Sequence, residues 1–132
     1  MQLEEFENEE LSLQNLGSCH KAIKYYDELI SANPNNTDTH FEKGETLQRL
    51  GKHKEAIESY DQALRLEPDC AATYFHQGLA LFHIRKDDEA IESYERAIEL
   101  KPGHITAYYS KGYSLQRLEK CMRKRYNSNQ IM

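Results

Sequence analysis

A spacing of 34 residues recurs along this sequence and constrains its fold more than any other feature. The hexapeptide Glu-Ala-Ile-Glu-Ser-Tyr occurs at 55–60 and again at 89–94, and the three prolines, Pro34, Pro68 and Pro102, keep the same spacing. A fixed period of this length is typical of stacked supersecondary units, none of which can bury its apolar face alone. The sequence therefore predicts an array of repeated units in place of one central core.

Each period contains two stretches in which apolar residues recur at helical spacing. A glycine or a proline follows each stretch, which predicts where the helix ends. We therefore expect two short helices per period. Their approximate ranges are 3–16, ended by Gly17, then 19–32, then 37–50, ended by Gly51, followed by further helices that stop before Pro68 and Pro102.

Three glycines share one phase of the period. Glycine inside a helix costs roughly 1 kcal/mol relative to alanine, which favours a position where two helices approach closely. We expect small residues of the second helix to face these glycines, and tyrosines of that helix to fill the wider gap towards the next unit. The glycines are Gly44, Gly78 and Gly112, the small residues are Ala22, Ala56 and Ala90, and the tyrosines are Tyr26, Tyr60 and Tyr94.

This combination of small, aromatic and proline residues resembles the tetratricopeptide repeat, a helix–turn–helix unit of 34 residues. The resemblance implies an all-α fold, an α-solenoid of antiparallel helix pairs wound into a right-handed superhelix. It rests on Gly44, Ala56, Tyr60, Pro68, Gly78, Ala90, Tyr94, Pro102 and Gly112. It divides the chain into a degenerate unit (3–36), two regular units (37–70 and 71–104), the first helix of a partial unit (105–119) and a divergent basic and polar tail (120–132).

Departures from the family pattern occur inside the units, where Lys43, Gln77 and Lys111 stand at usually apolar positions and His40 at an aromatic one, and towards both ends of the sequence. Glu10 stands where the family has a small residue, and Lys124 and Ser128 stand where the regular units have alanine and tyrosine. The last helix of the array is therefore expected to be missing, shortened or poorly amphipathic, with residues 120–132 forming a fraying tail. Glutamates near the start and basic residues near the end are either solvated surfaces or a means of head-to-tail stacking.

The resemblance also implies a concave groove, lined by the first helix of each unit, that binds peptides or other proteins. Phe41, Phe75 and Tyr109 form an aromatic row at the repeat spacing within this groove. A partner with an apolar or aromatic anchor fits such a surface better than an acidic tail does, although local packing is an alternative role for these rings. The groove residues carried over are Phe41, Glu45, Arg49, Phe75, Leu79, Phe82, His83, Tyr109, Tyr113 and Arg117.

Two binding modes known in the family are not matched. Chaperone-binding members hold a peptide C-terminal carboxylate with Lys, Asn, Asn, Lys and Arg, and neither register of the clamp supplies these cations here. The matching positions carry Glu7, Leu11, Glu42, Ala72 and His76 or, one unit later, Phe41, Glu45, His76, Thr106 and Ser110. The asparagine ladder of the O-GlcNAc transferase array would fall at Glu42, His76 and Ser110, and it is absent as well.

Charge and composition limit the classes of partner and the cellular compartment that can be expected for this chain. A net charge of −5 and a pI of about 5.7 argue against nucleic acid or an anionic membrane as the main partner. The acidic N-terminus is unlike a signal peptide, and no apolar run is long enough for a membrane span. Three cysteines without a C-x-x-C pair, namely Cys19, Cys70 and Cys121, favour free thiols. We therefore expect a cytoplasmic protein.

Signals of catalysis are weak. His76 and His83 are two helical turns apart, too far to share one metal ion, and no nucleophile arrangement or phosphate-binding glycine loop is present. No enzyme activity, metal or cofactor is expected. The prediction is a non-catalytic adaptor or scaffold for a protein or peptide partner of unknown identity. The alternatives are a self-associating segment, or a fragment of a longer array, that completes its partial last unit by oligomerisation, and a targeting domain for a catalytic part outside this chain.

Overall fold

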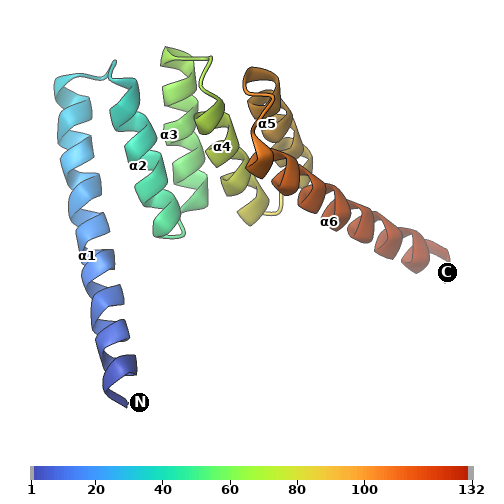
Figure 1. Ribbon diagram of the computed structural model, residues 1–132, viewed down its shortest axis with the longest axis horizontal. Helices are drawn as coiled ribbons and strands as arrows, with labels where there is room; N and C mark the ends of the chain where they lie inside the picture. The colour runs from blue at the N-terminus through green and yellow to red at the C-terminus, as the bar shows by residue number, and fades with distance from the viewer. Residues whose placement is uncertain (1, 131–132) are drawn as a thin grey trace. The chain divides into compact units, whose positions relative to one another are not determined.

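The computed structural model describes the backbone of residues 2–130 and the side chains of residues 15–129. Within that part of the chain every regular element is a helix, which confirms the all-α class (Figure 1). No described helix is both long and apolar enough to cross a membrane. The helices are α1 (Gln2–Ala32), α2 (Thr37–Arg49), α3 (His53–Leu66), α4 (Ala71–His83), α5 (Asp87–Leu100) and α6 (Ile105–Gln130).

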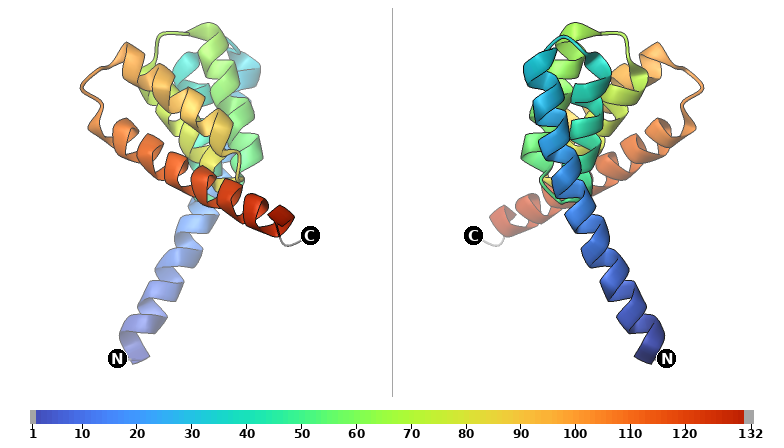
Figure 2. Two further views of the ribbon diagram at one scale, coloured as in Figure 1. Left: turned by 90° about the vertical axis from the view of Figure 1, so that its right-hand side faces the viewer. Right: turned by 90° about the vertical axis from the view of Figure 1, so that its left-hand side faces the viewer.

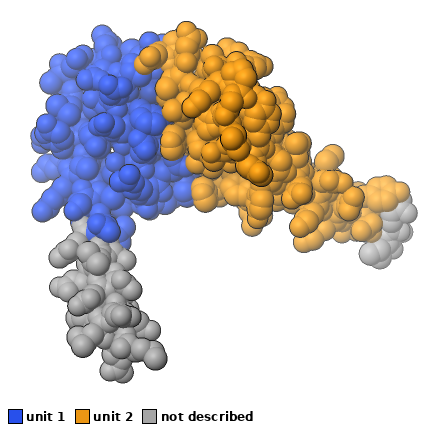
Figure 3. Space-filling view, viewed as in Figure 1, with its two compact units in different colours: residues 1–66 blue, residues 67–132 orange. Residues whose placement is uncertain are grey.

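The chain divides into two compact units, residues 1–66 and residues 67–132 (Figure 3). In the first unit α2 packs against both α1 and α3. In the second unit α5 packs against both α4 and α6, and α6 also touches α4. Each unit therefore consists of one antiparallel helix pair, α2–α3 or α4–α5, together with one additional long helix.

The turns inside the two helix pairs have the same geometry. The backbone N–H of Gly51 donates to the carbonyl of Gln48, and that of Lys52 donates to the carbonyl of Leu47, at 3.0 and 2.9 Å. This is the Schellman arrangement, which needs a left-handed residue after the helix. Gly51 has φ of 78°, and Arg85, one repeat later, has φ of 66°. Arg85 makes the same turn without the advantage of glycine.

The core of each helix pair consists of small residues and one tyrosine. Ala56, Tyr60 and Ala63 on α3 are fully buried, and so are Ala90 and Ala97 on α5, while Tyr94 is 1% exposed. Burial raises the pKa of Tyr94 to about 12, and a hydrogen bond with Ser110 of α6 opposes that rise in part. The two tyrosines are the largest fully buried side chains among the described residues.

The glycines face these tyrosines, so the expectation that alanines face them is wrong. A Cβ added at Gly44 would lie 2.5 Å from Cε1 of Tyr60, and one added at Gly78 would lie 2.5 Å from Cε1 of Tyr94. No side chain larger than hydrogen fits between these helices, because real Cβ atoms do not approach carbon atoms this closely. The tyrosine ring therefore closes its own helix pair instead of only filling a gap towards the next unit.

The first helix does not end at Gly17, contrary to the expectation from the sequence. α1 continues as one helix from Gln2 to Ala32 (Figure 2). A turn at Gly17 would have placed residue 10 against Tyr26, in the way that Gly44 lies against Tyr60. Residue 10 is a glutamate, whose Cβ cannot be accommodated at such a contact. The straight helix avoids that overlap, and the degenerate unit therefore lacks its helix pair.

Residues 120–130 extend α6 and do not form the separate, fraying tail that the sequence suggested. α6 runs as one helix from Ile105 to Gln130, and residues 131–132 lie outside the described part of the chain. Glu119 stands at the register of Gly51 and Arg85, but the backbone does not turn there. With Lys124 and Ser128 in place of alanine and tyrosine, a returning helix would have no apolar face to bury against α6.

Candidate functional site

An apolar groove lies between α4 and α6 in the second unit. It has a volume of about 380 Å³ and is lined by Leu79, Phe82, Tyr94, Tyr109, Ser110 and Tyr113. Tyr109 and Tyr113 are one helical turn apart on α6, so both rings project from the same face. They are 78% and 63% exposed, whereas Leu79 and Phe82 on α4 are half-buried. Large apolar side chains thus line a surface that solvent reaches.

The rings of Phe82 and Tyr113 meet edge to face across this groove, with their centroids 5.5 Å apart. This orientation suits aromatic quadrupoles and holds the α4 and α6 sides of the groove together. Tyr94 supplies the floor from α5, and its position is set by the close contact with Gly78. The shape of the groove therefore depends on the same glycine and tyrosine that close the helix pair.

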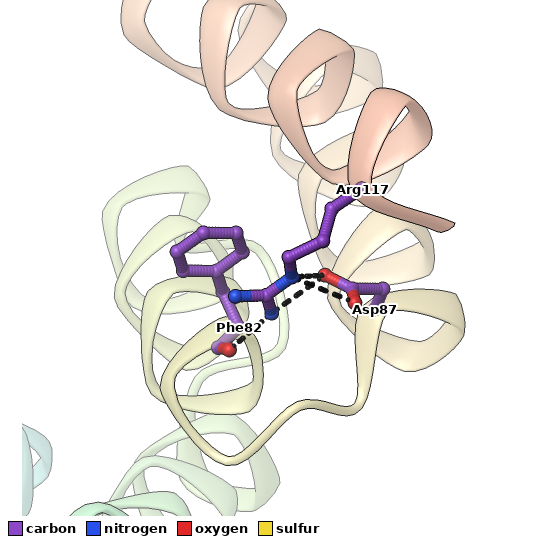
Figure 4. Close-up of polar contacts among 3 residues, drawn as sticks. All are labelled: Phe82, Asp87 and Arg117. Atoms are coloured by element: carbon purple, nitrogen blue, oxygen red, sulfur yellow. Dashed lines mark hydrogen bonds and ion pairs between the residues drawn. The ribbon is translucent and has the colours of Figure 1, made fainter. Parts of the chain in front are cut away.

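Arg117 of α6 borders this region, but its guanidinium is already engaged within the protein (Figure 4). Its Nε and Nη2 donate to the two carboxylate oxygens of Asp87 at 2.9 and 2.8 Å, and Nη2 also donates to the carbonyl of Phe82 at 2.5 Å. Its Cζ lies 3.6 Å from the centroid of the Phe82 ring. A fork of this kind is a strong, directional contact, so Arg117 positions Phe82 and is occupied before any partner arrives.

The remaining predicted groove residues of the second unit have different surroundings. Phe75 is half-buried, with ring centroids 6.0 Å from Tyr94 and 4.8 Å from His104, so its ring supports the fold. His83 is exposed, with its ring 5.8 Å from that of Phe82. The structure thus brings Leu79, Phe82, Tyr109 and Tyr113 together, while Phe75 packs away from them against the tyrosine core.

The predicted groove residues of the first unit do not form a comparable apolar surface. Phe41 is half-buried and packs on Tyr60, with ring centroids 5.9 Å apart. This contact favours the local-packing alternative for that ring. Glu45 is half-buried and Arg49 is exposed, and both are polar. Within this unit, therefore, the predicted positions supply no large exposed aromatic residue.

Sequence reasoning missed Asp87, which holds Arg117. The preceding unit carries His53 at the same register, so the repeat offers no signal that could have identified an acidic residue here. Residues suited to a metal ion are also not gathered anywhere in the described part of the chain, where no group of three His, Cys, Asp or Glu side chains converges. The three cysteines are free thiols in this structure.

Comparisons with known proteins identify the repeat. A family model described as "Tetratricopeptide repeat" matches residues 11–61 and residues 41–105. The crystal structure of MamA protein shares 32% identity with this chain, with a TM-score of 0.74, and the match covers 77% of this chain and 56% of MamA. This chain thus spans little more than half the length of that protein. No curated protein matches the chain.

Two structures of a second protein are also similar. The NMR structure of the first TPR domain of the human RPAP3 protein is 27% identical, with a TM-score of 0.75, and the match covers 89% of this chain and 91% of that domain. The first TPR of Spaghetti (RPAP3) bound to the HSP90 peptide SRMEEVD is 28% identical, with a TM-score of 0.75 and coverage of 78% and 82%. These similarities confirm that the helices form an all-α solenoid.

Proposed function

The chain belongs to the tetratricopeptide repeat family, a family of protein-interaction modules, and we propose that it holds a partner segment with an apolar or aromatic anchor in the groove between α4 and α6. One observation carries the proposal: Tyr109 and Tyr113 are largely exposed next to Leu79 and Phe82. Exposed aromatic residues around a hollow are the usual composition of an energetic centre in protein interfaces.

The size and chemistry of the groove define the kind of segment that fits. A hollow of about 380 Å³ is at the small end of ligand pockets, enough for one or two large side chains of a peptide. Tyrosine rings have few rotatable bonds, so ordering them on binding costs little entropy. The hydroxyl groups of the two exposed tyrosines can each donate and accept a hydrogen bond, which suits the backbone of an extended segment.

Charge argues against an acidic peptide as the main ligand. The RPAP3 structure contains the peptide SRMEEVD, but the clamp positions of this chain carry no lysine or arginine. Glu42 occupies one of these positions and would repel a carboxylate. Arg117 is paired with Asp87 and is not available as a substitute. The anchor of the proposed partner is therefore apolar, and salt should change its affinity only modestly.

A selection of random displayed peptides on the full chain tests this proposal. We expect the selected peptides to share aromatic or large aliphatic residues and to lose roughly thirtyfold in affinity for Tyr113→Ala, the usual loss for a central aromatic anchor. Tyr126→Ala is the matched control, because Tyr126 lies on the same helix, is 65% exposed and does not line the groove. The synthetic peptide SRMEEVD should bind weakly or not at all.

The proposal fails if the selected peptides bind Tyr113→Ala as well as they bind the unmodified chain. It also fails if the selected peptides are acidic and dissociate in moderate salt, because recognition would then depend on charged surfaces. Phe82→Ala is not a suitable variant, since the ring also contacts the guanidinium of Arg117 and its loss would disturb the ion pair with Asp87.

A further inference from the structure

One face of α6 lacks the helix that covers the equivalent face of α2 and of α4. A Cβ added at Gly112 would meet no described atom within 4 Å outside its own helix, in contrast to Gly44 and Gly78. Around Gly112 lies a shallow groove of about 510 Å³, lined by Ile105, Tyr108, Tyr109, Gly112, Tyr113 and Gln116. Four residues of this set, Ile105, Tyr108, Tyr109 and Tyr113, are more than half exposed. We call this surface the Gly112 face.

One face of α1 has the complementary deficiency. Tyr26 stands at the register of Tyr60 and Tyr94, but no glycine faces it, because α1 does not fold back on itself. A groove of about 720 Å³ opens beside it, lined by Asn15, Leu16, Ser18, Cys19, Ala22, Tyr26, Thr46 and Arg49. Tyr26 is only half-buried, whereas Tyr60 and Tyr94 are fully buried. We call this surface the Tyr26 face.

We propose that α6 of one copy of this chain packs antiparallel on α1 of a second copy, so that the Tyr26 ring covers Gly112. The two faces are the halves of one helix pair. α6 supplies the glycine helix without its tyrosine, and α1 supplies the tyrosine helix without its glycine. Their contact repeats the arrangement that already exists twice in the molecule, between Gly44 and Tyr60 and between Gly78 and Tyr94.

Two residues near Gly112, namely Gln116 and Tyr109, also fit the proposed contact between α6 and α1 of the second copy. In the first unit the hydroxyl of Tyr60 donates to Oε1 of Gln48 at 2.5 Å, and Gln116 occupies the register of Gln48 on α6. Gln116 can therefore accept a hydrogen bond from the hydroxyl of Tyr26 of the second copy. Phe41 and Phe75 each pack on the tyrosine of their own pair, and Tyr109 stands at their register. Its 78% exposure is explained by the missing tyrosine.

Charge supports the same direction of packing. With Gly112 opposite Tyr26 in an antiparallel pair, the second half of α6 runs along α1 towards its first half. The former carries Lys120, Arg123, Lys124 and Arg125, and the latter carries glutamates at 4, 5, 7, 9 and 10. At this register the basic residues lie opposite residues 13–18, next to the acidic segment, whereas in the reverse orientation they would lie beyond the end of α1, so charge favours the antiparallel pair. A second copy is therefore an occupant that satisfies both the packing of the Gly112 face and the charge of the adjoining half of α6.

The contact joins two different faces, so it is a head-to-tail association. Two copies that make both contacts close a ring of two, whereas copies joined by a single contact each keep one face free and can continue to add until a larger ring closes or a filament forms. The unmodified chain should therefore increase in average mass with concentration, to the mass of a dimer or beyond. The Gly112 face shares Tyr109 and Tyr113 with the peptide groove, so a second copy and a peptide compete for these rings, and peptide binding is to be measured where the chain is monomeric.

Sedimentation velocity of the full chain over a wide concentration range tests the proposal. Gly112→Ala places a Cβ where the Tyr26 ring must lie, so we expect about tenfold or greater weakening of self-association. This variant remains folded, since alanine is the better helix former and the added atom contacts nothing in the single copy. Gly103→Ala is the matched control: it makes the same change in the turn before α6, and it should associate like the unmodified chain.

A mixing experiment establishes which faces meet. Tyr26→Ala also removes self-association, but that variant keeps an intact Gly112 face, and Gly112→Ala keeps an intact Tyr26 face. An equimolar mixture should form a one-to-one dimer that does not grow, because the defective faces end the chain. The proposal is overturned if the unmodified chain stays monomeric, if Gly112→Ala associates normally, or if the mixture remains monomeric. At a concentration where the unmodified chain is monomeric, Tyr26→Ala should leave peptide binding by the α4–α6 groove unchanged, so the two proposals fail separately.

Discussion

Gly78 and Gly112 occupy the same register on α4 and α6, yet their surroundings differ completely. The hydrogen of Gly78 points at the buried ring of Tyr94, and no other residue would fit there. Gly112 points at no described atom of the chain beyond its own helix. The loss of helix propensity at glycine is offset by close packing at Gly78, and by no contact with a described residue at Gly112. A glycine that recurs at the repeat spacing can thus lack, within its own unit, the partner residue that its counterpart has.

The comparison extends to how each helix is held in its unit. α4 is covered by α5, which turns back after Arg85, whereas α6 continues past the equivalent position, Glu119. α6 has no returning helix and depends on its contact with α5 and its smaller contact with α4. At one end of that contact Arg117 forms the ion pair with Asp87, whose side chain is only 7% exposed. This pair takes over part of the role that a second helix has elsewhere.

The largest expected loss of stability follows from breaking the ion pair between Arg117 and Asp87. Arg117→Met leaves the Asp87 carboxylate nearly buried without its partner, and breaking such a pair costs about 3 kcal/mol or more. Arg49→Met is the matched control, since Arg49 has the same register on α2, is exposed and has Cys19 in place of Asp87. That change should cost less than about 0.5 kcal/mol. Urea denaturation of dilute protein measures both, and equal values would show that the ion pair does not anchor α6.

The next effect concerns the free energy of unfolding, which should change in opposite directions when Gly78 and Gly112 are each replaced by alanine. Gly78→Ala forces a Cβ against Tyr94 and should lower the free energy of unfolding by about 1–3 kcal/mol. Gly112→Ala adds its methyl to open space and should raise it by up to about 1 kcal/mol, through helix propensity alone. Thermal unfolding at a concentration where the chain is monomeric compares the two. A loss of stability in both variants would mean that Gly112 is covered within the single copy.

The repeat pattern predicted the helix pairs because each residue of a regular unit meets the same neighbours one period later. Ala56 and Ala90, and likewise Tyr60 and Tyr94, are buried as their phase required. The pattern assigned the wrong partner to the glycines, however. Phase identifies the face of a helix on which a residue lies, but not which side chain of the facing helix reaches it. The tyrosine ring, four residues beyond the alanine, is long enough to cover the glycine.

The candidate site was less predictable than the fold. Leu79, Phe82, Tyr109 and Tyr113 were identified from family positions and do gather in one groove. Phase alone did not distinguish Phe75, which packs on Tyr94, from Phe82, which lines the groove. It also could not reveal that Arg117 is occupied, because Asp87 is 30 residues away and has no counterpart in the preceding unit. Such a pair depends on tertiary structure and produces no pattern at the 34-residue spacing.

The smallest expected effect is a difference in stability between the alanine variants of Gly17 and Gly51. Gly17 and Gly51 share one register and the same local signals for the end of a helix, but only Gly51 has a positive φ. Gly51→Ala forces a Cβ into the left-handed region and should destabilise the chain by about 1 kcal/mol. Gly17→Ala should instead stabilise it by up to about 1 kcal/mol, because Gly17 lies inside α1 and an added Cβ meets no described atom within 4 Å. Circular dichroism during thermal unfolding, with both variants at equal concentration, measures this difference. A loss of stability in Gly17→Ala as large as that in Gly51→Ala would show that α1 turns at Gly17 after all, and the Tyr26 face would then be covered by the chain's own first residues.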